Sequence, residues 1–155
     1  MKKLIVLSLT LIFSFQLVNA QAKHHTDLKW HTNFAQAKKI AKKEHKPILM
    51  LFTGSDWCPP CKAMHNELFV NKDFIDISKK VVLVMVDFPR RKPISPEQKQ
   101  QNRQLQQKFH HGGVPTFVAV TPDEKILGKM SGYMYGAPER DIDFFKQMIE
   151  KYKQK

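Results

Sequence analysis

Short apolar runs alternate along the chain with longer segments of mixed apolar and polar residues. The runs at 48–53, 81–88 and 116–120 are rich in aliphatic residues, and such runs are typical of strands covered on both faces. A further strand is predicted at 125–130, after the turn residues Pro122-Asp123-Glu124. The pattern therefore predicts a largely buried β-sheet.

Helical segments are predicted between and around these strands. Asn33 is a capping residue type, and Pro59 and Pro96 fall in first turns, where the missing N–H of proline costs little. The last segment has apolar residues at helical spacing, which indicates a buried face. The predicted helices cover 33–45, 59–69, 71–79, 96–109 and 138–152.

The order of these elements predicts an α/β fold. Strands and helices alternate first, and two strands then follow each other directly. Crossover helices imply parallel neighbouring strands, whereas a tight turn implies an antiparallel pair. We therefore expect a mixed central β-sheet flanked by helices on both faces.

The N-terminus has the pattern of a secretory signal peptide over residues 1–20. Lys2 and Lys3 precede an apolar stretch, and Val18-Asn19-Ala20 offers small residues for cleavage near Ala20. An uncleaved anchor is the alternative, but the short apolar core favours removal. No later segment reaches the ~20 apolar residues of a membrane-spanning helix. We expect an exported protein, periplasmic or secreted, with a lead-in at 21–31 and one domain at 32–155.

The chain is basic, with 26 Lys and Arg against 14 Asp and Glu. The signal peptide holds two of the lysines, so the formal charge falls from +12 to +10 on its removal. Export and the spread of lysines along predicted helices argue against nucleic acid as a partner. We interpret the charge mainly as a solvated surface. Arg90-Arg91-Lys92 is the densest cluster and lies in a predicted loop.

The only two cysteines, Cys58 and Cys61, follow the apolar run at 48–53 and open a predicted helix. Unpaired N–H groups and the dipole at a helix N-terminus favour thiolate over thiol, and thiolate is the species that attacks disulfides. A stapled scaffold would carry more cysteines at scattered spacings. The pair therefore indicates redox chemistry.

Two motifs in this order of elements carry a family resemblance. Trp57-Cys58-Pro59-Pro60-Cys61 lies at a strand-to-helix junction, and Gly113-Val114-Pro115-Thr116 precedes a later strand. Over 32–152 the chain resembles the thioredoxin superfamily, and in particular exported bacterial thioredoxin-like thiol–disulfide oxidoreductases. The resemblance implies the thioredoxin fold for 32–155.

The resemblance also implies roles for individual residues. Cys58 would be the attacking thiol, which we expect to be partly exposed, and Cys61 would resolve the mixed disulfide. Pro115 would follow a cis peptide bond, and Val114 would pair with an extended substrate segment. Trp57 and the Gly132 loop would complete the substrate surface.

The expected partners are proteins with disulfides or thiols, together with a membrane electron donor. No cofactor or metal is required, and we expect a monomer. We favour a reductase over an oxidase or isomerase, since Val114 before the proline resembles reductases.

The chain departs from the family at the helper groups. Many thioredoxins place an acid six residues before the first cysteine and a lysine on the neighbouring strand. Those positions are Phe52 and, counting back from Asp87, Leu83. Glu44, Asp56 or His65 could replace the missing proton acceptor, and water could also serve.

Two other function classes remain open from the sequence. Cys58, Cys61 and His65 have a spacing that suits a copper(I)-binding thioredoxin-fold protein. A non-catalytic interaction module would instead keep the disulfide permanently oxidised.

Overall fold

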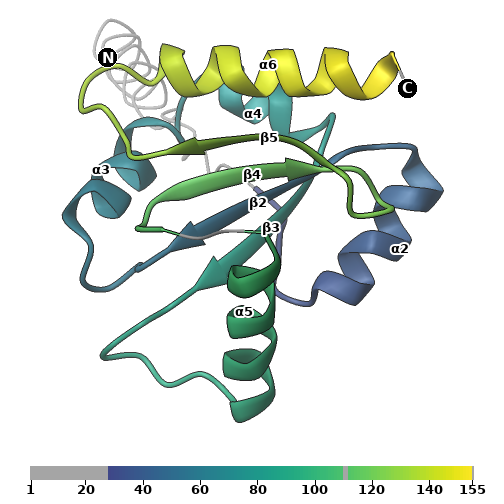
Figure 1. The fold of residues 1–155 in the computed structure, drawn as a ribbon. Helices are drawn as coiled ribbons and strands as arrows, with labels where there is room; N and C mark the ends of the chain where they lie inside the picture. The colour runs from purple at the N-terminus through teal and green to yellow at the C-terminus, as the bar shows by residue number, and fades with distance from the viewer. Residues whose placement is uncertain (1–27, 110–111, 155) are drawn as a thin grey trace, which may run out of the picture.

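A five-stranded mixed sheet forms the centre of the structure, a computed structural model that describes residues 28–109 and 112–154. The strand order is β1-β3-β2-β4-β5, and the predicted α/β fold with a mixed sheet is confirmed (Figure 1). The signal-peptide prediction and most of the lead-in lie outside the described residues. The strands are β1 (Trp30–His31), β2 (Ile48–Thr53), β3 (Val82–Asp87), β4 (Thr116–Val120) and β5 (Ile126–Ser131).

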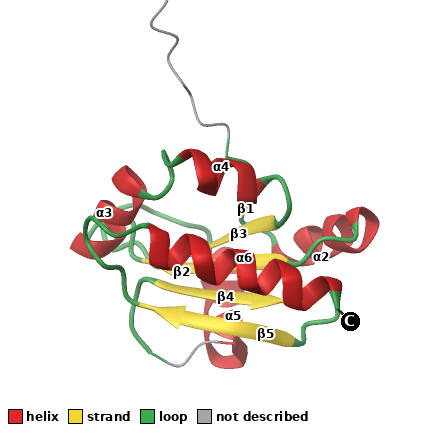
Figure 2. Cartoon of the chain, turned by 90° about the horizontal axis from the view of Figure 1, so that it is seen from above, coloured by secondary structure: helices red, strands yellow, loops and turns green. Residues whose placement is uncertain are grey.

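Helices cover both faces of the sheet (Figures 1 and 2). Buried residues of α3, α4 and α6 share one apolar cluster, whereas those of α2 and α5 share another on the opposite face. Among the described residues, no helix is long and apolar enough to cross a membrane. The helices are α2 (Phe34–Glu44), α3 (Pro59–Glu67), α4 (Lys72–Ser78), α5 (Pro96–Phe109) and α6 (Glu139–Lys153).

Strand β2 supplies side chains to both layers of the core, because successive residues of a strand point to opposite faces. Leu49 and Leu51 belong to the cluster under α3, α4 and α6, whereas Met50 and Phe52 belong to the cluster under α2 and α5. None of these four is more than 2% exposed. This double burial explains the uninterrupted apolar run.

The helix boundaries agree with the local signals in the sequence. The Asn33 side chain caps α2 by accepting a hydrogen bond from the Gln36 N–H at 2.9 Å. The same helix ends at His45, which adopts a left-handed conformation with φ of 52°.

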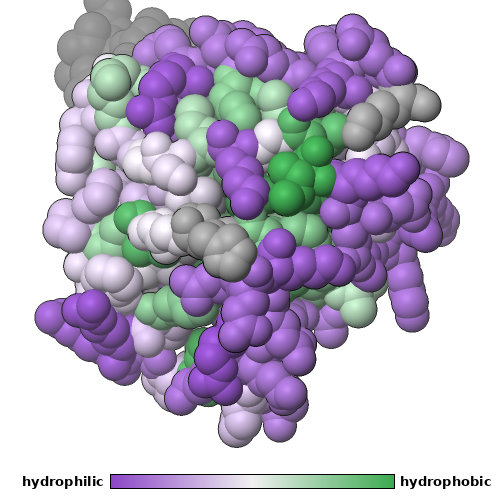
Figure 3. Space-filling model, in the orientation of Figure 1, coloured by the Kyte–Doolittle hydropathy of each residue, from purple (hydrophilic) through white to green (hydrophobic). Residues whose placement is uncertain are grey.

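Hydrophilic residues cover most of the face seen in the space-filling view (Figure 3).

Strand β4 corrects the expectation that crossover helices lead to parallel neighbours. β2 and β3, joined through α3 and α4, are parallel as expected. The connection through α5, however, places β4 antiparallel to β2, with Phe52 opposite Thr116. The apolar pattern of β4 suits a parallel or an antiparallel neighbour equally well, so only packing against β2 decides the direction of β4.

The sheet also includes residues from the stretch we expected to be a lead-in. Trp30 and His31 form β1 and pair in parallel with Leu83 and Val84 of β3. Trp30 packs against Phe69, with 5.2 Å between the ring centroids. Partial burial of this indole ties the segment to the edge of the sheet.

Asp141, in the first turn of α6, is a buried acid without a hydrogen-bond partner within the described residues. It is 0% exposed, and neither carboxylate oxygen is satisfied. Its closest cation is Arg140, with Nε 3.8 Å from Oδ2. Burial raises the pKa of the Asp141 carboxyl to about 6, and the charge of Arg140 offsets only part of this effect.

We expect Asp141→Asn to remove a pH-dependent cost to stability. The pKa is about 6 in the folded protein against an ordinary aspartate value of 3.8, so the cost of ionisation is absent below pH ~4 and complete above pH ~7. The variant should gain about 1–3 kcal/mol relative to wild type between pH 4 and pH 8. Urea unfolding across this range measures the difference, and a pH-independent difference would contradict the prediction.

Candidate active site

The turn between β2 and α3 sets the position of the cysteine pair. The Gly54 carbonyl accepts hydrogen bonds from the N–H groups of Trp57 and Cys58, at 3.2 and 2.9 Å. Cys58 is the N-cap of α3, and its Sγ accepts a hydrogen bond from the Cys61 N–H at 3.2 Å. The Cys61 N–H at the start of α3 is thus directed at the Cys58 sulfur, an arrangement that favours negative charge there.

Cys58 and Cys61 form a disulfide across the first turn of α3, with their Cα atoms 5.3 Å apart. Their exposed fractions are 2% and 4%. The expectation that Cys58 is partly exposed is therefore wrong for this oxidised form, because the first turn of α3 and the loop at Val114 pack against it.

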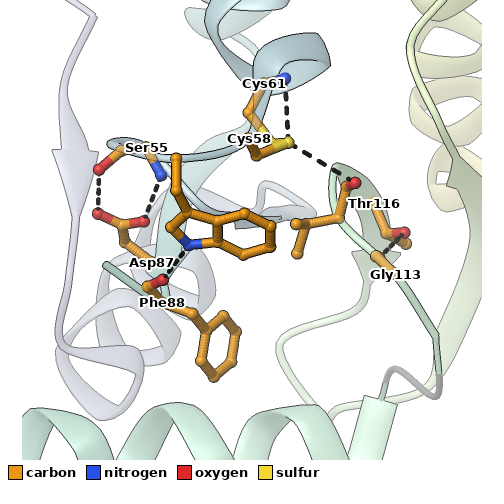
Figure 4. Close-up of a disulfide and its surroundings, with 9 residues drawn as sticks. Ser55, Cys58, Cys61, Asp87, Phe88, Gly113 and Thr116 are labelled. Atoms are coloured by element: carbon orange, nitrogen blue, oxygen red, sulfur yellow. Dashed lines mark hydrogen bonds between the residues drawn. A yellow bond between two sulfur atoms is a disulfide. The ribbon is translucent and has the colours of Figure 1, made fainter. Parts of the chain in front are cut away.

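The loop before β4 forms the second wall of the site. The Val114–Pro115 peptide bond is cis, as the resemblance implied. The Val114 carbonyl oxygen lies 3.7 Å from Cys58 Sγ (Figure 4). A disulfide sulfur has no hydrogen to donate, so this approach is a van der Waals contact in the oxidised form.

Gly132 lies beside this wall, since its N–H donates to the Pro115 carbonyl at 2.8 Å. Glu67 at the end of α3 holds the following loop by accepting hydrogen bonds from the Tyr133 hydroxyl and the Gly136 N–H, both at 2.8 Å. Burial and the hydrogen bond to Glu67 raise the pKa of Tyr133 above its ordinary range. Met134 and Tyr135 in this loop are 53% and 60% exposed.

The side chain of Trp57, which directly precedes Cys58, is fixed by two contacts. Its indole N–H donates to the Phe88 carbonyl at 2.8 Å (Figure 4). The Arg90 guanidinium lies 3.9 Å from the ring centroid, a cation–π contact. A Cβ on Gly54 would lie 2.4 Å from the indole. Only glycine therefore lets the indole lie this close to the turn.

Two polar groups connect the end of β3 to this turn. Asp87 accepts hydrogen bonds from the Ser55 N–H at 2.9 Å and the Ser55 hydroxyl at 2.6 Å (Figure 4). The buried Asn102 side chain on α5 donates to the Asp87 carbonyl at 2.7 Å. Helix α5, in the connection between β3 and β4, thus helps to hold the end of β3 beside the cysteine turn.

Asp56 anchors the loop that follows β3. Its carboxylate accepts hydrogen bonds from the backbone N–H groups of Arg90, Arg91 and Lys92, with shortest distances of 3.0, 2.6 and 3.0 Å. These bonds, that of Arg90 first, lower the pKa of Asp56 to about 2. Such a carboxylate is a poor proton acceptor.

The helper positions are apolar, but they do not form a facing pair. Phe52 lies opposite Val86 in the β2–β3 register, whereas Leu83 lies opposite Leu49. Phe52 and Leu83 also belong to clusters on opposite faces of the sheet. The inferred match of Leu83 with Phe52 was therefore wrong, although the actual neighbour, Val86, is equally unable to exchange a proton.

A cavity of about 370 Å³ lies beside Cys61, and His65 lines it together with Lys62 and Lys92. Of the three suggested proton acceptors, only His65 lines this cavity together with Cys61. Glu44 belongs to the end of α2, where it pairs with Lys46 at 2.7 Å.

The copper(I) alternative gains no support from the arrangement. Within the residues that the structure describes, no group of three or more His, Cys, Asp or Glu side chains could hold a metal ion. Cys58, Cys61 and His65 thus do not form such a group.

The sequence predicted roles for both cysteines, Val114, Pro115, Trp57 and Gly132, and the structure places them in one region; the contacts that hold them were not predicted. The Ser55–Asp87 pair and the Asp56 anchor join residues more than 30 positions apart. The only signal for the anchor was an acid in the turn and a dense basic cluster in a loop. Nothing in the sequence indicated that these segments meet.

The family model for the thioredoxin-like domain matches residues 34–149. The chain therefore belongs to the thioredoxin-like domain family.

Two relatives from Chlamydia pneumoniae are similar in sequence. The disulfide bond reductase DsbH is 33% identical over 105 residues, which are 67% of this chain and 63% of DsbH. The thioredoxin-related protein DsbJ is 28% identical over 137 residues, 86% of this chain and 39% of DsbJ. The chain thus spans less than two thirds of either relative.

Solved structures give the same fold. A DsbH oxidoreductase superposes with a TM-score of 0.68 at 28% identity, covering 79% of this chain and 84% of that one. A thioredoxin from Thermus thermophilus gives a TM-score of 0.61 at 16% identity, covering 80% and 88%. The thioredoxin fold implied by the sequence motifs is confirmed.

We expect Gly54→Ala to displace Trp57, since the added methyl would overlap the indole. The loss of the Phe88 hydrogen bond and the Arg90 stacking should cost about 1–3 kcal/mol of stability and change tryptophan fluorescence. Gly113→Ala is the matched control, because its Cβ would meet nothing within 4 Å. Equal fluorescence and stability for the two variants would contradict the packing argument.

Proposed function

We propose that the protein is an exported thiol–disulfide oxidoreductase that reduces or exchanges disulfides in other proteins. The observation that carries the proposal is the disulfide at the N-terminus of α3, with Cys58 Sγ 3.7 Å from the Val114 carbonyl beside Pro115. The sulfur that accepts the Cys61 N–H is also the one in contact with the half-buried Val114 of the loop before β4. This is where an extended substrate could add as a strand.

In the reductive direction, the Cys58 thiolate attacks one sulfur of a substrate disulfide. A mixed disulfide forms, and the other substrate sulfur leaves as a thiolate. Cys61 then loses its proton and attacks Cys58 Sγ, so that the Cys58–Cys61 disulfide forms and the second substrate sulfur is released. Two electrons pass to the substrate, and its two sulfurs take up two protons.

Trp57, Val114, Pro115 and Gly132 form the proposed substrate surface. Support comes from the connected backbone, in which Gly132 is hydrogen bonded to Pro115 and Val114 contacts Cys58. The exposed Met134 and Tyr135 side chains extend this surface with apolar area. Apolar side chains next to the backbone of the loop before β4 suit an unfolded or extended protein segment.

The predicted signal peptide is the basis for the exported location, and cleavage near Ala20 is tested by sequencing the N-terminus of the exported protein. In that compartment the oxidised protein would be recharged by a membrane electron donor. The chain would act as a monomer without a cofactor.

We expect Cys58→Ser to abolish disulfide exchange, because no attacking thiol remains at the N-cap. Cys61→Ser should instead accumulate mixed disulfides, because attack is retained and resolution is lost. Insulin reduction and non-reducing gels after trapping measure the two steps. Activity retained in Cys58→Ser would sink the assignment, and a disulfide inert to dithiothreitol would favour the non-catalytic module.

We further propose the reductive direction, which the reductase named among the relatives supports. A reductase should have a potential near −270 mV, as in thioredoxin, whereas a strong oxidant lies near −120 mV. Equilibration of the Cys58–Cys61 pair with glutathione and dithiothreitol buffers measures the potential. A value near −120 mV would assign the protein as an oxidase instead.

A further inference from the structure

Three consecutive cations, Arg90, Arg91 and Lys92, form a basic loop beside the disulfide. Their backbone N–H groups converge on the Asp56 carboxylate, so an acid next to the cysteine turn fixes the loop through its main chain. All three side chains are exposed. Among the described residues, none of the three takes part in an ion pair.

The basic loop reaches Trp57 and the cavity beside Cys61. Arg90 lies on the indole of Trp57, at 3.9 Å from the ring centroid, and Trp57 directly precedes Cys58. Lys92 lines the cavity beside Cys61 together with Lys62 and His65. Positive charge is therefore held next to Trp57 and at the cavity that Cys61 lines.

The loop is held in a fixed position. Trp57, on which Arg90 stacks, is itself hydrogen bonded to the Phe88 carbonyl at 2.8 Å. A loop fixed at both its main chain and one side chain loses little further entropy when it binds a partner. An arginine held in this way can form paired hydrogen bonds with a carboxylate.

We propose that the basic loop recognises an acidic segment next to the reactive cysteine of the partner protein. The inference rests on the proposed function and adds a substrate class to it. Carboxylates a few residues from the partner's disulfide would meet Arg90, Arg91 and Lys92 while the disulfide reaches Cys58. Such pairing increases the rate of productive encounter and selects against basic partners.

The test uses three synthetic peptide disulfides that differ only beside the cysteine, with Glu, Gln or Lys in the same positions. The rate constant for reduction of each peptide by the reduced wild-type protein is measured at low salt. The Glu peptide should react about five- to ten-fold faster than the Gln peptide, and the Lys peptide slowest. The preference should shrink in about 0.5 M salt.

Charge reversal in Arg91→Glu/Lys92→Glu should bring the Glu-to-Gln rate ratio to one or below. The milder Arg91→Gln/Lys92→Gln should lower it part of the way and serves if the first variant is unstable. Lys39→Glu/Lys43→Glu is the matched control, with the same change of charge on exposed residues of α2, and should keep the wild-type ratio. Figure 1 shows α2 on the opposite side of the sheet from α3.

Each outcome separates this inference from the proposed function. A wild type that reduces all three peptides at equal rates retains the function and overturns the recognition of acidic segments. An unchanged ratio in the charge-reversed variant also overturns it, because the preference would then come from elsewhere. A wild type that reduces none of the peptides overturns both.

Discussion

The antiparallel pairing of β2 with β4 is the constraint on which the site depends. Phe52 lies opposite Thr116 in this register, so the C-terminal end of β2 and the N-terminal end of β4 lie side by side at the same end of the sheet. The cysteine turn follows the first strand, and Val114-Pro115 precedes the second. If β4 ran parallel to β2, the proline loop would lie at the other end of the strands, and the disulfide would lack its second wall.

At that end of the sheet, polar contacts rather than apolar packing hold the loops in place. The helper position Phe52 and its neighbour Val86 are buried and apolar, so they contribute to the core but offer no proton acceptor. Ser55, Asp87 and Asp56 instead hold the cysteine turn and the basic loop by hydrogen bonds. The chain thus uses its acids near the site to fix backbone, and its cations remain available to solvent and partners.

Much of the fold followed from local signals. The apolar run at 48–53, the Asn33 cap and the prolines at first turns placed strands and helices within one or two residues, because such signals act over a single helical turn or strand. The short β1 was missed because a two-residue strand has no periodicity of its own. Its pairing depends on a neighbour about 50 residues away.

The sequence by itself determined the chemistry: a cysteine pair at a strand-to-helix junction, and a Val-Pro-Thr motif before a later strand. These are properties of neighbouring residues, and short-range geometry fixes them. Only the tertiary structure decided the direction of β4, the neighbour of Phe52 and the contact of Asp56 with the basic loop. The reason is physical, since each is a contact between distant segments whose local preferences allow several pairings, and only burial of the shared core selects one.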